Sequence, residues 1–262
     1  MFRFTPMVKN ILIINLVVFV LQSMMSLNLS EIFGLRVVFA EEFQIFQFLT
    51  YMWIHGGFGH LFGNMFAVLI FGPMLEQIWG PKRFLTFYLV CGIGAGILFG
   101  AVDFAEKLSL KNDMEAYVAD PNPEDFKLFI LDHASYSNGI TYLNDFADEY
   151  YDNPNSEQLI MQSKQFVEEI FYVFSNIPMV GASGAVFGIL MAFAMLFPNT
   201  TLYLYFAIPV KAKYVVFAYA MFEIYSELNR SPGDNVAHLA HLGGMLIAFI
   251  MLKYWQRNAN RF

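Results

Sequence analysis

The sequence predicts an all-α polytopic membrane protein, and three observations support this fold class. Of the 262 residues, 57% are hydrophobic and 18% are aromatic, whereas only 14% are charged. The mean hydropathy of +0.49 is too high for a soluble domain of this size. The apolar residues also gather in six segments, each of about the length needed to cross a bilayer as a helix.

These six segments, called spans one to six, differ in length, and span five is the shortest. They cover residues 9–28, 59–78, 83–102, 177–197, 213–228 and 236–254. Span one follows Arg3 and Lys9, as a signal peptide would, but it lacks a small-residue cleavage site. We therefore expect a retained anchor. The single cysteine, Cys91, lies in span three, which excludes an internal disulfide and predicts a small buried hydrophobic side chain.

A polar block, residues 103–176, separates spans three and four. It holds 15 of the 22 acidic residues but only 4 of the 15 basic ones, so its net charge is −11 and the rest of the chain is mildly basic. Within it, "DPNPEDF" predicts a turn. The stretch "NSEQLIMQSKQFVEEIFYVF" begins with cap-like residues and predicts an amphipathic helix that leads into span four.

The basic residues predict that both termini are cytoplasmic, because cytoplasmic loops favour Lys and Arg. With six spans and the N-terminus inside, every short inner connection is basic. The inner basic residues are Arg3, Lys9, Lys82, Arg83, Lys211, Lys213, Lys253, Arg257 and Arg261. The run "FAIPVKAKYV" then forms a cytoplasmic loop whose lysines face lipid head groups, and not a nucleic-acid patch. Residues 29–58 lie outside, where their aromatic sequence predicts a helix in the membrane interface.

Polar residues in three of the spans point to a functional site. Span two begins with His60 and Asn64 on one helix face, span four carries Ser183 in "GASG", and span six carries His238 and His241. All three spans run from outside to inside. Ser183 and His241 each lie about 8 Å below the outer end of their span, at 1.5 Å per residue. A hydroxyl, two imidazoles and an amide therefore come to one depth.

Small residues predict that spans four and six approach closely. Gly184 and Gly188 form a small-xxx-small pair on span four, and Gly243, Gly244 and Ala248 supply small residues on span six. Taken alone, "GASG" is more typical of helix contacts than of catalysis. Combined with histidines at the same depth, it indicates that the short Ser183 side chain can reach a histidine.

A serine beside a histidine is the nucleophile and general base of acyl transfer. His60, Asn64 and the backbone N–H of Ser183 are candidate donors to the oxyanion of the tetrahedral intermediate. No Asp or Glu lies at this depth in spans two, four or six, which predicts a dyad. We favour His241 as the base because small residues follow it, with His238 in an assisting or structural role.

At this point the sequence resembles the rhomboid family of intramembrane serine proteases. The matching motifs are "HGGFGHLFGNMFAVLIFG" in span two, "GASG" in span four and "AHLGGM" in span six, in that order. Each motif is weak alone, but the ordered set is specific and covers nearly the whole chain except the acidic block. The resemblance implies a six-helix rhomboid core, 1–262, with the block 103–176 as an extracytoplasmic insertion.

The resemblance also implies an activity, which is the cleavage of transmembrane segments near their outer end by Ser183 and His241. It implies an oxyanion hole that includes His60 and Asn64 and is flanked by Gly181. Residues 29–58 would be the family's membrane-embedded first loop, held in part by His55, and span five would move to admit substrate.

Two departures from the family stand out besides the long insertion. The Trp-Arg pair of the first loop is replaced by Phe46-Gln47, which questions how this loop is anchored. Four residues after the serine, Phe187 replaces a common tyrosine, so that an aromatic ring remains to stack on the histidine.

Two other function classes are alternatives to a protease. An inactive rhomboid-like protein that binds transmembrane helices would lack the dyad, and a channel or transporter would spread its polar residues across the membrane depth. We expect transmembrane protein substrates and the lipid bilayer as partners, no nucleic acid and no cofactor. No Cys/His set has zinc spacing, and His133 suits a surface histidine better than a metal ligand. The short N-terminal tail favours a bacterial plasma membrane.

Overall fold

The structure is a computed structural model, and it describes residues 4–24, 28–134, 140–204, 207–229 and 236–259. Helices make up most of these residues. The elements in chain order are α1 (Pro6–Met24), α2 (Leu29–Phe33), α3 (Gln47–Thr50), the 3₁₀ helix η1 (Tyr51–Trp53), α4 (Phe58–Trp79), α5 (Pro81–Ala119), α6 (Pro123–His133), α7 (Ile140–Asp152), α8 (Glu157–Ser175), α9 (Ser183–Leu196), β1 (Thr201–Leu204), β2 (Ile208–Lys211), α10 (Ala212–Leu228) and α11 (His238–Ala259).

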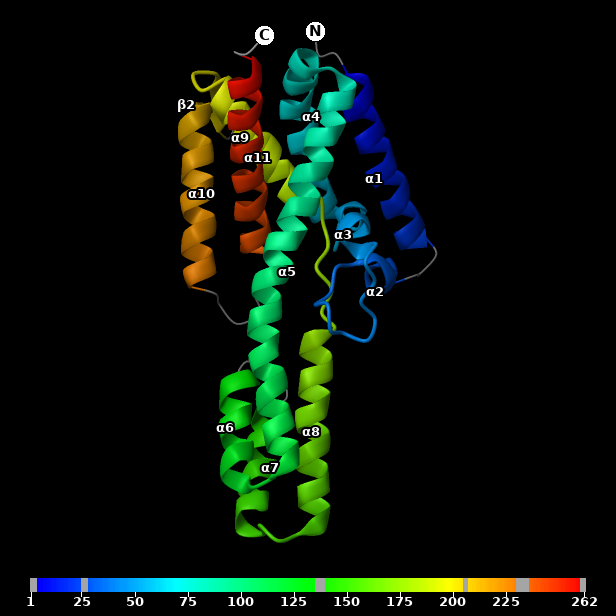
Figure 1. Cartoon of the computed structure of the whole chain (residues 1–262), viewed down its shortest axis with the longest axis vertical. Helices are drawn as coiled ribbons and strands as arrows, with labels where there is room; N and C mark the ends of the chain where they lie inside the picture. Colours follow the sequence, from blue (N-terminus) through cyan, green and yellow to red (C-terminus); the bar gives the residue numbers. More distant parts are fainter. Residues whose placement is uncertain (1–3, 25–27, 135–139, 205–206, 230–235, 260–262) are drawn as a thin grey trace.

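Two helical bundles share the long helix α5 (Figure 1). The first half of α5 lies among α1, α4, α9, α10 and α11, and its second half lies beside α6, α7 and α8. The sequence predicts that span three ends at residue 102, but α5, 39 residues long, ends at Ala119. The reason is local, because no glycine or proline interrupts residues 101–120 before Pro121.

The chain is a membrane protein by the length and composition of its helices. Among the described residues, α1, α4 and α5 are long and apolar enough to cross a membrane, and α9 is a shorter apolar helix of 14 residues. Helices α10 and α11, with 17 and 22 residues, lie alongside them in the same bundle. The count of six spans remains a prediction.

Both chain ends lie at the same end of the molecule as β2, opposite the α6–α8 bundle (Figure 1). This arrangement agrees with a chain that crosses the bundle an even number of times. Two of the basic residues that orient the chain, Arg3 and Arg261, lie outside the described residues.

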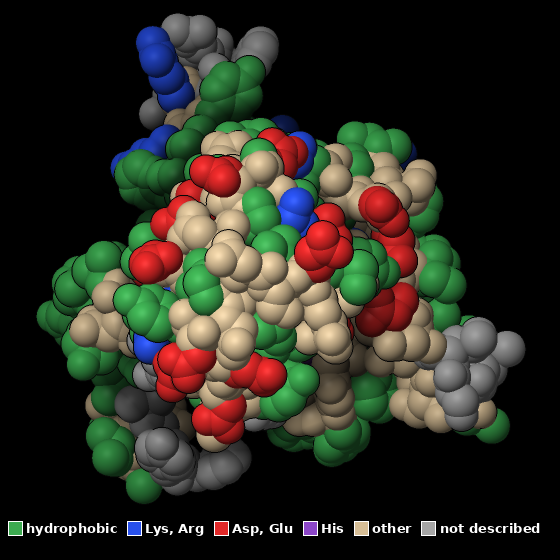
Figure 2. Space-filling view, turned by 90° about the horizontal axis from the view of Figure 1, so that it is seen from below, with side chains coloured by type: hydrophobic (Ala, Val, Ile, Leu, Met, Phe, Trp, Pro, Cys, Tyr) green, Lys and Arg blue, Asp and Glu red, His purple; other side chains and the backbone are tan. Residues whose placement is uncertain are grey.

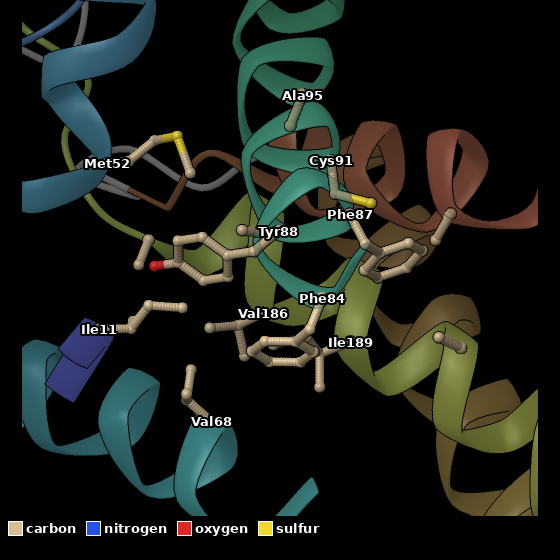
Figure 3. Close-up of a cluster of buried hydrophobic side chains, with 14 of the residues drawn as sticks. Ile11, Met52, Val68, Phe84, Phe87, Tyr88, Cys91, Ala95, Val186 and Ile189 are labelled. Atoms are coloured by element: carbon tan, nitrogen blue, oxygen red, sulfur yellow. The ribbon is translucent and has the colours of Figure 1, made fainter. Parts of the chain in front are cut away.

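The core of the upper bundle forms around α5 (Figure 3). Phe84, Phe87 and Tyr88 are fully buried there, and the Phe84 ring lies beside Val186 and Ile189 of α9. In a bilayer, such contacts stabilise by close van der Waals fit, since lipid tails are as apolar as these side chains. The α5 thiol of the single cysteine is also buried in this cluster, as the sequence predicts.

Residues 29–58 are folded differently from our prediction of one interfacial helix. They form the short helices α2, α3 and η1, joined by turns. The side chain of Arg36 is fully buried at their centre, where it donates to the backbone oxygens of Glu31 and Asn176. In a continuous helix, backbone N–H groups would donate hydrogen bonds to these carbonyl oxygens; here the buried guanidinium, which has several N–H donors, does so.

Gln47 contributes to the same anchor, which answers the question raised by Phe46-Gln47. Its buried side-chain NH₂ group donates to the backbone oxygens of Ile32 and Glu42, at 3.2 and 3.0 Å. Its side-chain oxygen accepts from the backbone N–H of Arg36 at 3.4 Å. The first loop of this chain is therefore held by a buried arginine and a buried glutamine.

The insertion has a small core of its own, built from aromatic and aliphatic side chains of α5 to α8. Ser156 caps α8 where the sequence predicts a helix start, and Asn122 caps α6, which begins inside the predicted turn "DPNPEDF". Inside it, the Tyr117 hydroxyl bonds to Ser163 Oγ at 2.6 Å, and burial raises the pKa of Tyr117. Figure 2 views this end of the molecule and shows many Asp and Glu side chains on its surface.

One element departs from the all-helical prediction. The connection between α9 and α10 is an antiparallel hairpin in which β1 pairs with β2, with Thr201 opposite Lys211. The run "FAIPVKAKYV" therefore includes a strand, although it still connects two spans. Pro209 and the neighbouring β-branched residues suit a short edge strand.

Candidate active site

Ser183 is the first residue of α9, and not a residue two turns inside a helix as the depth estimate assumed. The preceding segment is extended, and Met179 exchanges two backbone hydrogen bonds with Leu35 of the first loop, at 2.8 and 2.9 Å. The Gly181 N–H donates to the Tyr51 oxygen at 2.9 Å. Gly181, the first glycine of "GASG", therefore lies at the sharp turn between the extended segment and α9.

The start of α9 carries free backbone donors. The first N–H groups of a helix have no acceptor within the helix, and no side chain caps α9 at Ala182. The helix dipole adds a partial positive charge at the same place. The backbone around Ser183 is therefore suited to stabilise a developing negative charge.

Helices α9 and α11 meet through glycine. A Cβ atom built on Gly244 would lie 1.8 Å from the backbone oxygen of Gly184, and one built on Gly184 would lie 2.5 Å from Ala95 Cβ. Gly188 is similarly confined, with Cys91 at 2.8 Å and the Gly244 oxygen at 3.3 Å. No larger residue fits at these positions without moving a backbone, so the two helices lie as close as the small residues suggest.

This close contact brings His241 to the face of α9 that carries Ser183. The His241 ring stacks on Phe187, with centroids 4.2 Å apart and planes 6° apart. Phe187 follows Ser183 by four residues, and residues four apart on a helix lie on one face. The His241 ring therefore packs on α9 one turn after Ser183.

A carboxylate that sequence reasoning missed lies on the other side of this histidine. Glu223 of α10 is buried, and its Oε2 lies 2.9 Å from His241 Nδ1 and 2.5 Å from His238 Nδ1. The prediction of a dyad considered only spans two, four and six, whereas Glu223 lies in span five. The signal was present, because an acidic residue in an apolar segment is itself a reason to look for a site.

Glu223 sets the tautomer of His241. A carboxylate accepts hydrogen bonds, so the bonded Nδ1 of the neutral imidazole carries the proton. The Nε2 atom, on the far side of the ring, then holds the lone pair that can accept a proton. This is the arrangement that a general base needs, with Glu223 in the place of the orienting acid.

His60 lies beside Gly181, two residues before Ser183. A Cβ atom on Gly181 would lie 2.6 Å from both Cε1 and Nε2 of His60, and Gly181 has a φ of +123°, which favours glycine. The Gly56 N–H points at His60 Nδ1, 3.4 Å away. This contact leaves Nε2 to carry the proton, so that an N–H donor faces the backbone beside Ser183.

Asn64 and His55 complete the set. Asn64 lies one turn after His60 on α4, and its buried Nδ2 has no acceptor within the part of the chain that the structure describes. A buried donor without a partner is costly, which suggests that it serves a ligand. His55 is fully buried, and its ring meets that of His60 edge to face, with centroids 5.0 Å apart.

A family model of the Rhomboid domain matches residues 42–110 and 159–257, which is well over half of the chain. This chain belongs to the rhomboid family. The match confirms the resemblance stated from the three motifs. It includes all of the residues assigned to the site, whereas residues 111–158, in the middle of the insertion, lie outside it.

Three relatives from Arabidopsis thaliana illustrate the similarity. RHOMBOID-like protein 12, mitochondrial, is 26% identical over 82% of this chain and 47% of its own length. RHOMBOID-like protein 6, mitochondrial, is 48% identical over 20% of this chain and 17% of its own, and Inactive RHOMBOID-like protein 8 is 37% identical over 24% and 17%. The chain thus spans less than half the length of these relatives. No solved structure matches it.

These comparisons bear on two of our expectations. The relatives include one named as inactive, so family membership by itself does not separate a protease from an inactive rhomboid. They are plant proteins, two of them named mitochondrial, and they lend no support to a bacterial plasma membrane. Membership of a membrane family agrees with the apolar helices.

Proposed function

We propose that this rhomboid protein is a serine endopeptidase that cleaves transmembrane segments of other membrane proteins. The observation that carries the proposal is the environment of His241. Its ring stacks on Phe187, four residues after Ser183 on α9, and its Nδ1 lies 2.9 Å from Glu223 Oε2.

In this proposal, Nε2 of His241 takes the proton of the Ser183 hydroxyl as the oxygen attacks the carbonyl carbon of the scissile peptide bond. The oxyanion that forms accepts hydrogen bonds from His60 Nε2–H, Asn64 Nδ2–H and the backbone N–H of Ser183. Each such donor contributes about 10² to 10³ in rate. His241 then gives its proton to the leaving amine, and water releases the acyl group by the same route.

Glu223 acts as a positioning residue in this scheme. It keeps the His241 proton on Nδ1 and stabilises the imidazolium that forms when the ring takes a second proton. The proposed machinery is therefore the Ser183–His241 dyad of the sequence prediction, supported by a carboxylate from α10.

The substrates follow from the same arrangement. The site lies inside a bundle of apolar helices, so a peptide bond that reaches it comes from a segment stable in lipid. The charge scheme places the chain termini in the cytoplasm and the insertion outside, with the site in the outer half of the membrane.

The alternative is an inactive rhomboid protein that binds transmembrane helices, and the relative named as inactive makes it worth testing. Against it stand Ser183 and His241 together, with a buried acceptor on the histidine. An inactive protein has no need of this tautomer.

The deciding experiment measures cleavage of a model single-span protein by the purified chain in liposomes. The natural sequence is compared with Ser183→Ala and His241→Ala, with thermal unfolding of each variant as the folding control. We expect the natural protein to cut within or beside the span and both variants to be inert at unchanged stability. Equal behaviour of all three would replace the protease by the helix-binding protein.

A further inference from the structure

Three side chains of metal-binding type converge where α10 meets α11. Glu223 comes from α10, and His238 and His241 come from the first turn of α11, three residues apart and so on one helix face. Among the described residues, these three form a group whose ligand atoms all lie within 4.8 Å of one another. All three residues are buried.

The geometry already directs the ligand atoms to one point. Both Nδ1 atoms face the same carboxylate oxygen, Glu223 Oε2, at 2.5 and 2.9 Å. Two histidines and one glutamate are a known ligand set for zinc, with bonds of about 2.0–2.2 Å and a fourth position left open. An ion between the three atoms requires only that they move slightly apart.

The charges favour a cation of a particular class. Metal-binding imidazoles are neutral, so together with the Glu223 carboxylate they would present a net negative charge in a buried site, which a divalent ion would compensate. Imidazole nitrogen suits transition metals, whereas Mg²⁺ and Ca²⁺ prefer oxygen ligands. The group therefore fits Zn²⁺ better than the common alkaline-earth ions.

We propose that Glu223, His238 and His241 form a binding site for a divalent transition-metal ion, Zn²⁺ above all, and that an ion bound there silences the protein. Binding is a property of these three residues alone. The silencing part rests on the proposed protease function.

Proton positions explain the silencing. In the metal-free state each imidazole carries its proton on Nδ1 and donates it to Glu223. To bind the ion through Nδ1, each neutral ring moves that proton to Nε2, and no proton is lost or gained overall. His241 Nε2 then carries a hydrogen and cannot accept one from Ser183. The nucleophile loses its base, and removing the ion restores it.

Sequence reasoning missed this site for the same reason that it missed the carboxylate. The two histidines are three residues apart, but the third ligand precedes them by fifteen positions in another helix. No local zinc spacing exists in the sequence, and only the contact between α10 and α11 assembles the ligands.

The binding test uses Co²⁺ as a spectroscopic probe, on full-length protein purified in detergent without a histidine tag. We expect one Co²⁺ per chain with the strong visible absorption of a four-coordinate site, and displacement by one equivalent of Zn²⁺. Glu223→Gln and His238→Gln should each weaken binding by at least about 10-fold. His133→Gln is the matched control, because His133 also lies beside a carboxylate, Asp113, at 2.9 Å in the insertion.

The absence of a four-coordinate spectrum, or binding that is unchanged in both variants, would overturn the inference. Loss of binding only in the His133 variant would also overturn it, since the ion would then sit in the insertion. Binding with the expected variant pattern in a protein that cleaves nothing would support the metal site and reject the protease.

The silencing test measures cleavage with and without Zn²⁺, followed by a chelator. We expect Zn²⁺ to remove at least about nine-tenths of the activity and the chelator to restore it. Each variant is compared with its own metal-free rate, and His238→Gln should need at least about 10-fold more Zn²⁺ for the same inhibition. Full cleavage by a protein shown to hold the ion would overturn the silencing part.

Discussion

Two of the helices that pack against α11 hold it in different ways. Towards α9 the contact is between backbones, with Gly244 against the Gly184 oxygen and no space for a side chain. Towards α10 the contact is sparse, because few α10 residues are buried, and its hydrogen bonds are those that the carboxylate of Glu223 accepts from the two histidines. Close contact sets where His241 lies, and the carboxylate sets which of its nitrogens carries the proton.

The two contacts should therefore fail differently when they are changed. A disturbed backbone contact displaces the histidine and the serine together, and it should affect folding as well as activity. A disturbed carboxylate leaves the helices in place and should affect catalysis alone. Three substitutions test this difference, in decreasing order of expected effect.

Gly244→Ala tests the backbone contact. Its new methyl group would overlap the Gly184 oxygen, so α9 and α11 must separate, and displacements of about 1 Å cost about 10²-fold in rate. We expect a loss of at least that size and a lower unfolding temperature in detergent. Gly243→Ala is the control, because its Cβ meets its nearest neighbour, Ala95 Cα, at 3.3 Å. Equal behaviour of the two variants would show that the helices are less close.

Glu223→Gln tests the carboxylate. The amide keeps the shape of the side chain but removes the charge that holds the proton on His241 Nδ1, which in a serine protease triad costs up to about 10⁴ in kcat. We expect kcat to fall by about 10²- to 10⁴-fold, with KM and thermal stability nearly unchanged. Glu168→Gln, an exposed residue of α8, controls for the change of charge. A fall in stability equal to that of Gly244→Ala would make Glu223 structural.

Phe187→Leu tests the ring stacked on His241 and should have the smallest effect. An aromatic stack contributes about 0.5–1.5 kcal/mol. If this energy stabilises the orientation in which the His241 ring accepts the Ser183 proton, its loss lowers the rate by about 2- to 10-fold. Phe187→Tyr keeps the ring and should stay within about 2-fold of the natural sequence. A larger loss in the tyrosine variant than in the leucine variant would contradict stacking as the role of this residue.

Much of the candidate site could be predicted from the sequence because it depends on local spacing. His60 and Asn64 are four residues apart, His238 and His241 are three apart, and helical periodicity alone places each pair on one face. The caps at Asn122 and Ser156 were also predictable, because a cap bonds to its own first turn.

Features that depend on distant partners could not be predicted in this way. The single-helix prediction for residues 29–58 failed because backbone groups there bond to partners that are not helical neighbours: Gln47 donates to the Ile32 oxygen, and Leu35 exchanges two backbone hydrogen bonds with Met179. The extension of α5 to Ala119 was missed because the hydropathy of a span ends at the membrane, whereas a helix ends where its sequence breaks it.

The sequence by itself determined the membrane class, the family, the serine and histidine of the proposed mechanism, and the glycines that let two helices meet. Only the tertiary structure decided that Glu223 joins His241. The carboxylate and the imidazole lie eighteen residues apart on different helices, and the chain between them sets no distance. Their contact exists because α10 and α11 lie side by side, and a buried carboxylate is stable there only when donors such as these two Nδ1–H groups reach it.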